Sequence, residues 1–134
     1  MHSPYRFLLY QPIMLLYCES ARGQFTDDFA DGNFTADPAW AGNDAFFTVD
    51  NGMLRSNTGT LAAATTYYLS TASSQAAGQW EFYFNLKFAT SGANYVDVYL
   101  MSDVQDLSAP ANGYFVRIGE TADHVTLNKM AAGS

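Results

Sequence analysis

Residues that could bind a ligand alternate with apolar residues along three strand-like segments. In the segment 80–88, WEFYFNLKF, every second residue is aromatic or leucine, and polar groups lie between them. Side chains of a strand point alternately to opposite faces, so the polar members of 80–88, 95–101 and 114–118 are predicted to lie away from the core. Tyrosine joins an aromatic body to a hydrogen-bonding tip, which suits amphipathic ligands. The candidate ligand-binding residues are Tyr83, Asn85, Tyr95, Asp97, Tyr99 and Arg117.

The same residues also have a structural interpretation. Tyrosine is a preferred strand residue and a packing partner across strands. Asp97 and Arg117 have opposite charges and could pair between neighbouring strands. The residue pattern leaves both interpretations open.

Groups that could carry catalysis are scarce. A glycosidase needs two carboxylates around the scissile bond, and the polar face of 80–88 has one, Glu81. A Ser-His-Asp triad would need His124, and no G-x-S-x-G motif is present to hold its serine. No His/Cys set has the spacing of a zinc site. We therefore predict a protein without catalytic residues and without a zinc site.

An acidic stretch between residues 27 and 44 is the one candidate cation site. Calcium takes several oxygen ligands, but the spacing of a complete calcium loop is missing here. Aspartate and asparagine are also ordinary turn residues. The pattern favours turn chemistry and keeps calcium as the alternative. The residues concerned are Asp27, Asp28, Asp31, Asn33, Asp37, Asn43 and Asp44.

Strands are the elements that must position these side chains. Short aromatic and β-branched runs are separated by turn residues, and apolar residues at helical spacing extend over no more than about two turns. Asn51-Gly52 is the preferred pair for a two-residue type I′ hairpin turn. The pattern predicts an all-β fold, an antiparallel β-sandwich. The predicted strands are 25–29, 46–50, 53–56, 65–71, 80–88, 95–101, 114–118 and 124–130.

Length and composition restrict the function further. The chain has 134 residues, 6 Lys+Arg against 13 Asp+Glu, a net charge of −7 and 16% aromatic residues. This length suits one domain. The acidic balance argues against nucleic-acid binding, which needs basic charge. The aromatic content argues against disorder, because it provides apolar area to bury.

The first 23 residues predict a secretory signal peptide. Arg6 precedes the apolar stretch 7–18, and Ala21-Arg22-Gly23 fits the small-residue pattern of a cleavage site. The stretch is shorter than the about 20 residues that span a bilayer. We expect a secreted protein with no membrane span in the mature chain.

Cleavage after Gly23 would leave residues 24–134 as one β-sandwich domain. Cys18 would be removed, so the domain would hold together without disulfides. The sequence stops at Ser134, just after the last predicted strand. We expect the domain to be cut off at its C-terminal side.

Three local motifs carry a family resemblance. They are D-D-F-x-D-G-x-F from Asp27 to Phe34, the loop Pro38-x-Trp40-x-Gly42, and the hairpin 46–55. With WEFYFNLKF and GYFVRIG, they make the chain similar to the N-terminal region of large secreted proteins of Bacteroidetes type. That region resembles a concanavalin A-like lectin/glucanase jelly roll. The resemblance implies an extracellular, multi-domain protein with lamin-tail-like modules and a sorting domain, and a concave sheet on which sugars stack.

These observations predict a secreted, non-catalytic module that binds a polysaccharide or a cell-surface glycan and serves adhesion. A structural spacer domain without a ligand is one alternative. Part of a glucanase-type hydrolase, with its acid pair on strands beyond Ser134, is the other.

Overall fold

The computed structural model describes residues 26–59, 65–75 and 77–132, so the predicted signal peptide lies outside the described residues. These residues form antiparallel strands and one 3₁₀ turn, η1 (Asp44–Phe46), which confirms the all-β class. None of their helices could cross a lipid bilayer. The strands are β1 (Ala41–Gly42), β2 (Phe47–Val49), β3 (Leu54–Ser56), β4 (Leu69–Ser70), β5 (Tyr95–Ser102), β6 (Gly113–Gly119) and β7 (His124–Met130).

The predicted hairpin is confirmed as β2 and β3. Val49 pairs with Leu54, and Asp50 and Met53 exchange backbone hydrogen bonds of 3.0 and 3.2 Å. The two residues between them have positive φ, 52° at Asn51 and 68° at Gly52. A type I′ turn needs this conformation at both positions, which explains the Asn-Gly pair.

The largest sheet has the order β5-β6-β7 and confirms the last three predicted strands. β6 pairs with β7 in unbroken register, whereas the β5–β6 register shifts between Tyr99 and Met101. Phe115 and Ile118 on β6 are buried, 8% and 3% exposed. The middle strand therefore carries most of the core found among the described residues.

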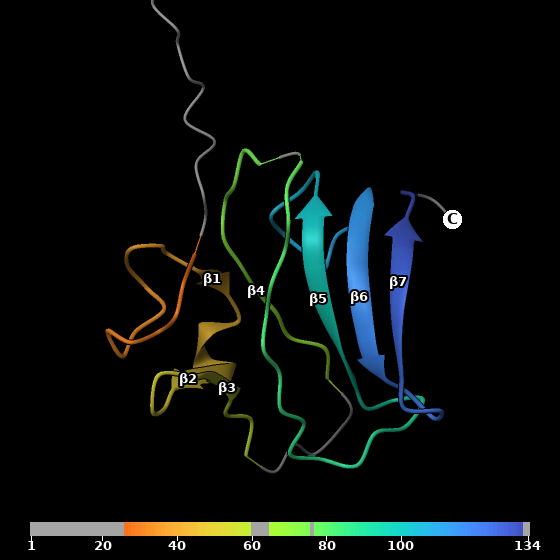
Figure 1. Cartoon of the computed structure of the whole chain (residues 1–134), viewed down its shortest axis with the longest axis horizontal. Helices are drawn as coiled ribbons and strands as arrows, with labels where there is room; N and C mark the ends of the chain where they lie inside the picture. Colours follow the sequence, from red (N-terminus) through yellow and green to blue (C-terminus); the bar gives the residue numbers. More distant parts are fainter. Residues whose placement is uncertain (1–25, 60–64, 76, 133–134) are drawn as a thin grey trace, which may run out of the picture.

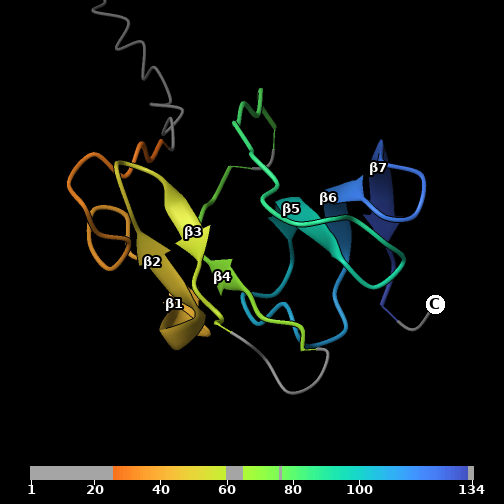
Figure 2. The same ribbon diagram turned by 90° about the horizontal axis from the view of Figure 1, so that it is seen from below.

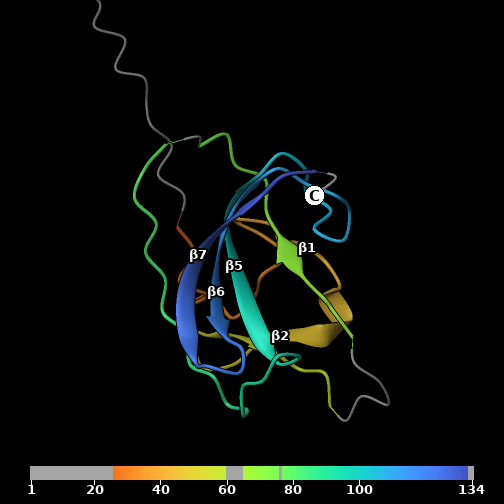
Figure 3. The same cartoon turned by 90° about the vertical axis from the view of Figure 1, so that its right-hand side faces the viewer.

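Two layers are visible in the arrangement of the strands. Figure 1 shows β1 to β4 beside β5, with β6 and β7 progressively farther away. Figure 2, turned by 90°, gives the same order. In Figure 3 the β5-β6-β7 sheet has β1 and β2 on one side and the extended segment that precedes β5 on the other. This layering is consistent with a β-sandwich.

Three predicted strands are wrong in whole or in part. Residues 26–29 are irregular, because the side chains of Asp27 and Asp28 accept the backbone N–H groups of Phe29 and Ala30 and form turns. Of 65–71, only Leu69–Ser70 is a strand.

The strongest predicted strand, 80–88, is also wrong. The segment forms no ladder, and its aromatic side chains are exposed. Alternation shows that a segment could present two faces, but a strand also needs a neighbour whose backbone groups pair with its own.

Candidate ligand-binding face

Four of the six predicted site residues lie on one face of the β5–β6 pair. Asp97 on β5 stands opposite Arg117 on β6, and Tyr99 stands opposite Phe115. Tyr95 lies two residues before Asp97, so its side chain shares the same face. We call this surface the Tyr–Arg face; its residues are Tyr95, Asp97, Tyr99, Phe115 and Arg117.

Arg117 is the centre of this face. Its Nε and Nη2 atoms donate to the two carboxylate oxygens of Asp97 at 2.7 and 2.8 Å, and its Nη1 donates to Glu120 at 3.0 Å. The guanidinium carbon lies 4.0 Å from the centroid of the Tyr95 ring, a cation–π contact. The hydrogen bonds to Asp97 raise the pKa of Arg117 above its ordinary value, and Glu120 adds to this effect. The ion pair between strands, which the sequence left as one of two interpretations, is present in the structure.

The end of the face at Tyr99 and Phe115 belongs to the core. Tyr99 and Phe115 stack with ring centroids 5.3 Å apart, and Phe115 is buried. Burial also raises the pKa of the Tyr99 hydroxyl. The prediction that this face points wholly away from the core is therefore wrong. Alternation identifies which residues share a face, but it does not identify which face the second layer covers.

Tyr83 and Asn85 do not join the other four predicted residues. Both lie on the irregular segment 80–88, and Tyr83 is 80% exposed. No hydrogen bond or ring contact connects them to the Tyr–Arg face within the described part of the chain. Their predicted placement depended on the strand that does not form.

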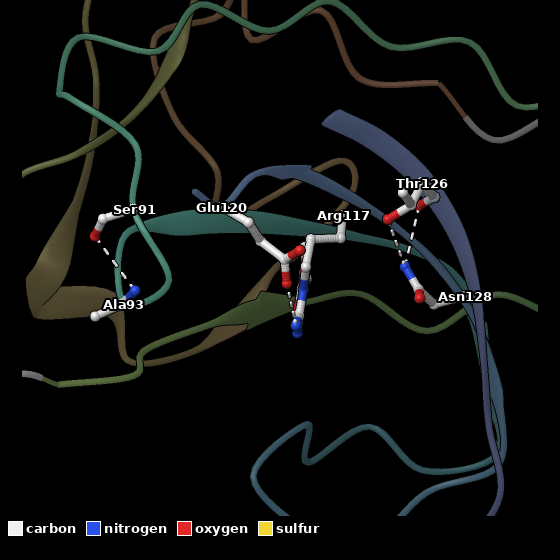
Figure 4. Close-up of polar contacts among 7 residues, drawn as sticks. Ser91, Ala93, Arg117, Glu120, Thr126 and Asn128 are labelled. Atoms are coloured by element: carbon white, nitrogen blue, oxygen red, sulfur yellow. Dashed lines mark hydrogen bonds and ion pairs between the residues drawn. The ribbon is translucent and has the colours of Figure 1, made fainter. Parts of the chain in front are cut away.

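Sequence reasoning missed three polar residues next to Arg117. Thr126 on β7 stands opposite Arg117, and Asn128 stands opposite Phe115. The Asn128 amide donates to the backbone oxygen and the hydroxyl of Thr126 at 3.1 and 3.0 Å. Figure 4 shows Glu120 and Arg117 turned toward each other, with Thr126 and Asn128 on the neighbouring strand. Thr126 and Asn128 alternate with Val125 and Leu127 in the sequence, but only the β6–β7 register shows that they lie beside Arg117.

The β6–β7 side of the face is open to a ligand. Tyr95 is 38% exposed, Thr126 is exposed, and the second layer lies on the β5 side of the sheet (Figures 1 and 2). We call this half-open surface the β6–β7 shelf. It consists of Tyr95, Arg117, Glu120, Thr126 and Asn128.

The acidic stretch folds into a series of turns. Trp40 Nε1 donates to Asp27 at 2.7 Å, Asp31 accepts the N–H of Asn33 at 3.1 Å, and Asn33 accepts the N–H of Thr35 at 3.0 Å. An open hollow of about 410 Å³ lies among Thr26, Asp27, Asp28, Asp31 and Asp37. Over residues 26–59, 65–75 and 77–132, no group of three His, Cys, Asp or Glu side chains has the arrangement of a metal site. The hydrogen bonds of Asp31 and Asn33 join residues two apart and are the turn chemistry that the spacing favours.

A second polar cluster connects the 103–112 loop to β4. The Tyr68 hydroxyl donates to Asp106 at 2.9 Å, and the Ser108 hydroxyl and N–H donate to the same carboxylate oxygen. Ser70 Oγ donates to the backbone oxygen of Gln105 at 2.8 Å. The Ser108 hydrogen bonds, followed by that of Tyr68, hold the pKa of Asp106 below its ordinary value.

Replacing Ser108 with alanine should raise the pKa of Asp106, because the hydroxyl that stabilises its charged form is lost. A carboxylate with a lowered folded pKa stabilises the fold above its ordinary pKa, and this contribution is lost as the pH falls through the lowered value. The Ser108→Ala variant should lose this stabilising contribution of Asp106 at a higher pH than the wild type does. NMR titration of the Asp106 carboxyl carbon measures the change. Ser102→Ala is the control, since Ser102 bonds to Val104 instead; an unchanged Asp106 titration in Ser108→Ala would contradict the assignment.

Comparisons of the chain with protein-family models, curated proteins and solved structures found no match. The resemblance to a concanavalin A-like jelly roll stays a prediction.

Proposed function

We propose that this chain is a non-catalytic β-sandwich module that binds a polysaccharide or a cell-surface glycan on the β6–β7 shelf. One observation carries the proposal. The half-exposed ring of Tyr95 is held in place by Arg117, whose guanidinium is itself fixed by Asp97 and Glu120.

A fixed aromatic ring is a suitable platform for a sugar. The apolar face of a pyranose stacks on an aromatic surface, and its hydroxyl groups need donors and acceptors at the edge. Glu120 provides an exposed carboxylate, and Thr126 and Asn128 provide a hydroxyl and an amide. Because the side chains of Tyr95 and Arg117 are already ordered, the protein would lose little side-chain entropy when a ligand binds there.

The wider setting of this function belongs to the same proposal. Residues 1–23 would direct secretion, and the sandwich would be a jelly roll of concanavalin A-like type within a larger extracellular protein. The resemblance of residues 27–57 and the apolar stretch 7–18 support this setting.

Replacing Tyr95 with alanine should weaken glycan binding about tenfold, because loss of a stacked ring costs about 1.4 kcal/mol. A glycan array with the wild-type chain selects the polysaccharide, and isothermal titration calorimetry then measures the dissociation constant of each variant.

Tyr114→Ala is the matched control. Tyr114 is 39% exposed and lies on β6, but the alternation of that strand places it on the opposite face. The Tyr114→Ala variant should bind the glycan with the same dissociation constant as the wild type. Equal loss in both variants, or no glycan bound by the wild type, would contradict the proposal.

A structural spacer without a ligand is the second candidate. It is favoured by the three hydrogen bonds and the cation–π contact that already engage the Arg117 guanidinium and reduce its capacity to bind a ligand. If the wild-type chain bound no glycan on the array, the result would favour the structural spacer.

A further inference from the structure

β7 is an edge strand with little of the usual protection: one lysine. Within residues 26–59, 65–75 and 77–132, β7 pairs with β6 alone, over its full length and without a bulge. Edge strands commonly avoid association through charge, proline, bulges or short length. β7 is HVTLNKM, seven residues with one lysine and no acidic residue or proline.

Its apolar side chains are also unusually exposed. Val125 is 62% exposed and Leu127 is 68% exposed. They share one face with Tyr114 of β6, the residue opposite Lys129. A regular, open edge next to an exposed apolar face is the combination that pairs with another strand.

We propose that β7 pairs with β7 of a second copy of this chain, antiparallel, about a two-fold axis at Thr126. This register sets Val125 opposite Leu127 of the partner, and the symmetry repeats that contact. Thr126 stands opposite its own copy, and paired threonines are favourable across antiparallel strands. The two sheets then join as one sheet of six strands, with the same patch used on both copies.

The distribution of charge favours a second copy of the chain as the partner of β7, and it favours this register. The chain has a net charge of −7, so two copies repel over most of their surface, but β7 carries no acidic side chain. The axis at Thr126 brings Lys129 next to Asp123 of the partner at both ends. Lys129 forms no ion pair with the described residues, and Asp123 uses only Oδ1, for the Thr90 hydroxyl. Moving the axis to Leu127 would set Lys129 opposite Val125.

The mass of the full chain in solution tests the proposal. Size-exclusion chromatography with light scattering, over a dilution series, should give twice the monomer mass for the wild type. Leu127→Lys should give a monomer with an unchanged circular dichroism spectrum. Met53→Lys changes an exposed apolar residue outside β7 and should stay dimeric. A monomeric wild type, or a dimer unaffected by Leu127→Lys, would overturn the proposal.

A cysteine placed at the axis tests the register and does not depend on the folding of Leu127→Lys. In a Cys18→Ser background, Thr126→Cys should cross-link two chains with a short bifunctional maleimide, because opposed Cβ atoms are about 4.5–5.5 Å apart. Thr121→Cys, on the exposed turn before β7, should not cross-link. Equal cross-linking at both positions, or none at position 126, would overturn the pairing.

Discussion

Replacing Asp97 with alanine should lower the free energy of unfolding by about 2 kcal/mol, measured by urea denaturation. The change removes two charge-assisted hydrogen bonds and leaves the Arg117 guanidinium partly buried without its main partner. Hydrogen bonds to charged groups contribute about 1.5–3 kcal/mol, and a broken buried pair costs about 3–5 kcal/mol. The side chains here are 26% and 18% exposed, so water compensates in part and the lower range applies.

Asp50→Ala is the matched control, because it also removes an aspartate from an arginine. The Arg55–Asp50 pair lies on the surface, with side chains 50% and 43% exposed. Exposed pairs contribute about 0–1 kcal/mol, so this variant should unfold close to the wild type. An Asp97→Ala variant as stable as Asp50→Ala would contradict the central role of Arg117.

Strands and turns that depend on local chemistry could be predicted from the sequence. The hairpin at Asn51-Gly52 follows from a turn that needs positive φ at two consecutive positions. Residues 95–101 and 124–130 also formed strands, because period-two alternation was matched there by a neighbouring strand. In each of these segments, a local sequence pattern that favours a strand is matched by a neighbouring strand that pairs with it.

The segment 80–88 had the best alternation and forms no strand. Alternation is a property of one segment, whereas a ladder is a property of two. Residues 26–29 form no strand for a different reason. The side chains of Asp27 and Asp28 accept the backbone N–H groups of Phe29 and Ala30, which a strand would use for pairing.

The residues of the candidate site also fall into two groups, those that the sequence identified and those that it missed. A pair between Asp97 and Arg117 was one of the two interpretations that the sequence left open, because their charges are opposite, and the structure contains it. Glu120, Thr126 and Asn128 were missed because their places beside Arg117 depend on the turn after β6 and on the β6–β7 register. A side-chain contact across strands cannot be assigned before the register is known.

Replacing Gly113 with alanine should cost about 3 kcal/mol of unfolding free energy, the upper part of the range for overpacking. Gly113 opens β6 and pairs with Ser102 and Met130. A methyl group there would overlap the backbone oxygen of Met101 and would lie 3.1 Å from Cα of Ser102. These are backbone atoms of β5, which cannot rotate away as a side chain can. The β5–β6 register shifts just before these atoms, between Tyr99 and Met101.

The close approach, rather than the loss of a glycine, is the cause of this expected cost. Gly92→Ala tests the distinction, since the added methyl group would meet only the Thr121 hydroxyl at 3.4 Å. It should change the unfolding free energy by no more than about 0.5 kcal/mol. Urea denaturation of both variants gives the comparison. If Gly113→Ala proved as stable as Gly92→Ala, β5 and β6 could not approach each other as closely as the β5-β6-β7 sheet requires, and the strand that carries Phe115 and Arg117 would need a different register.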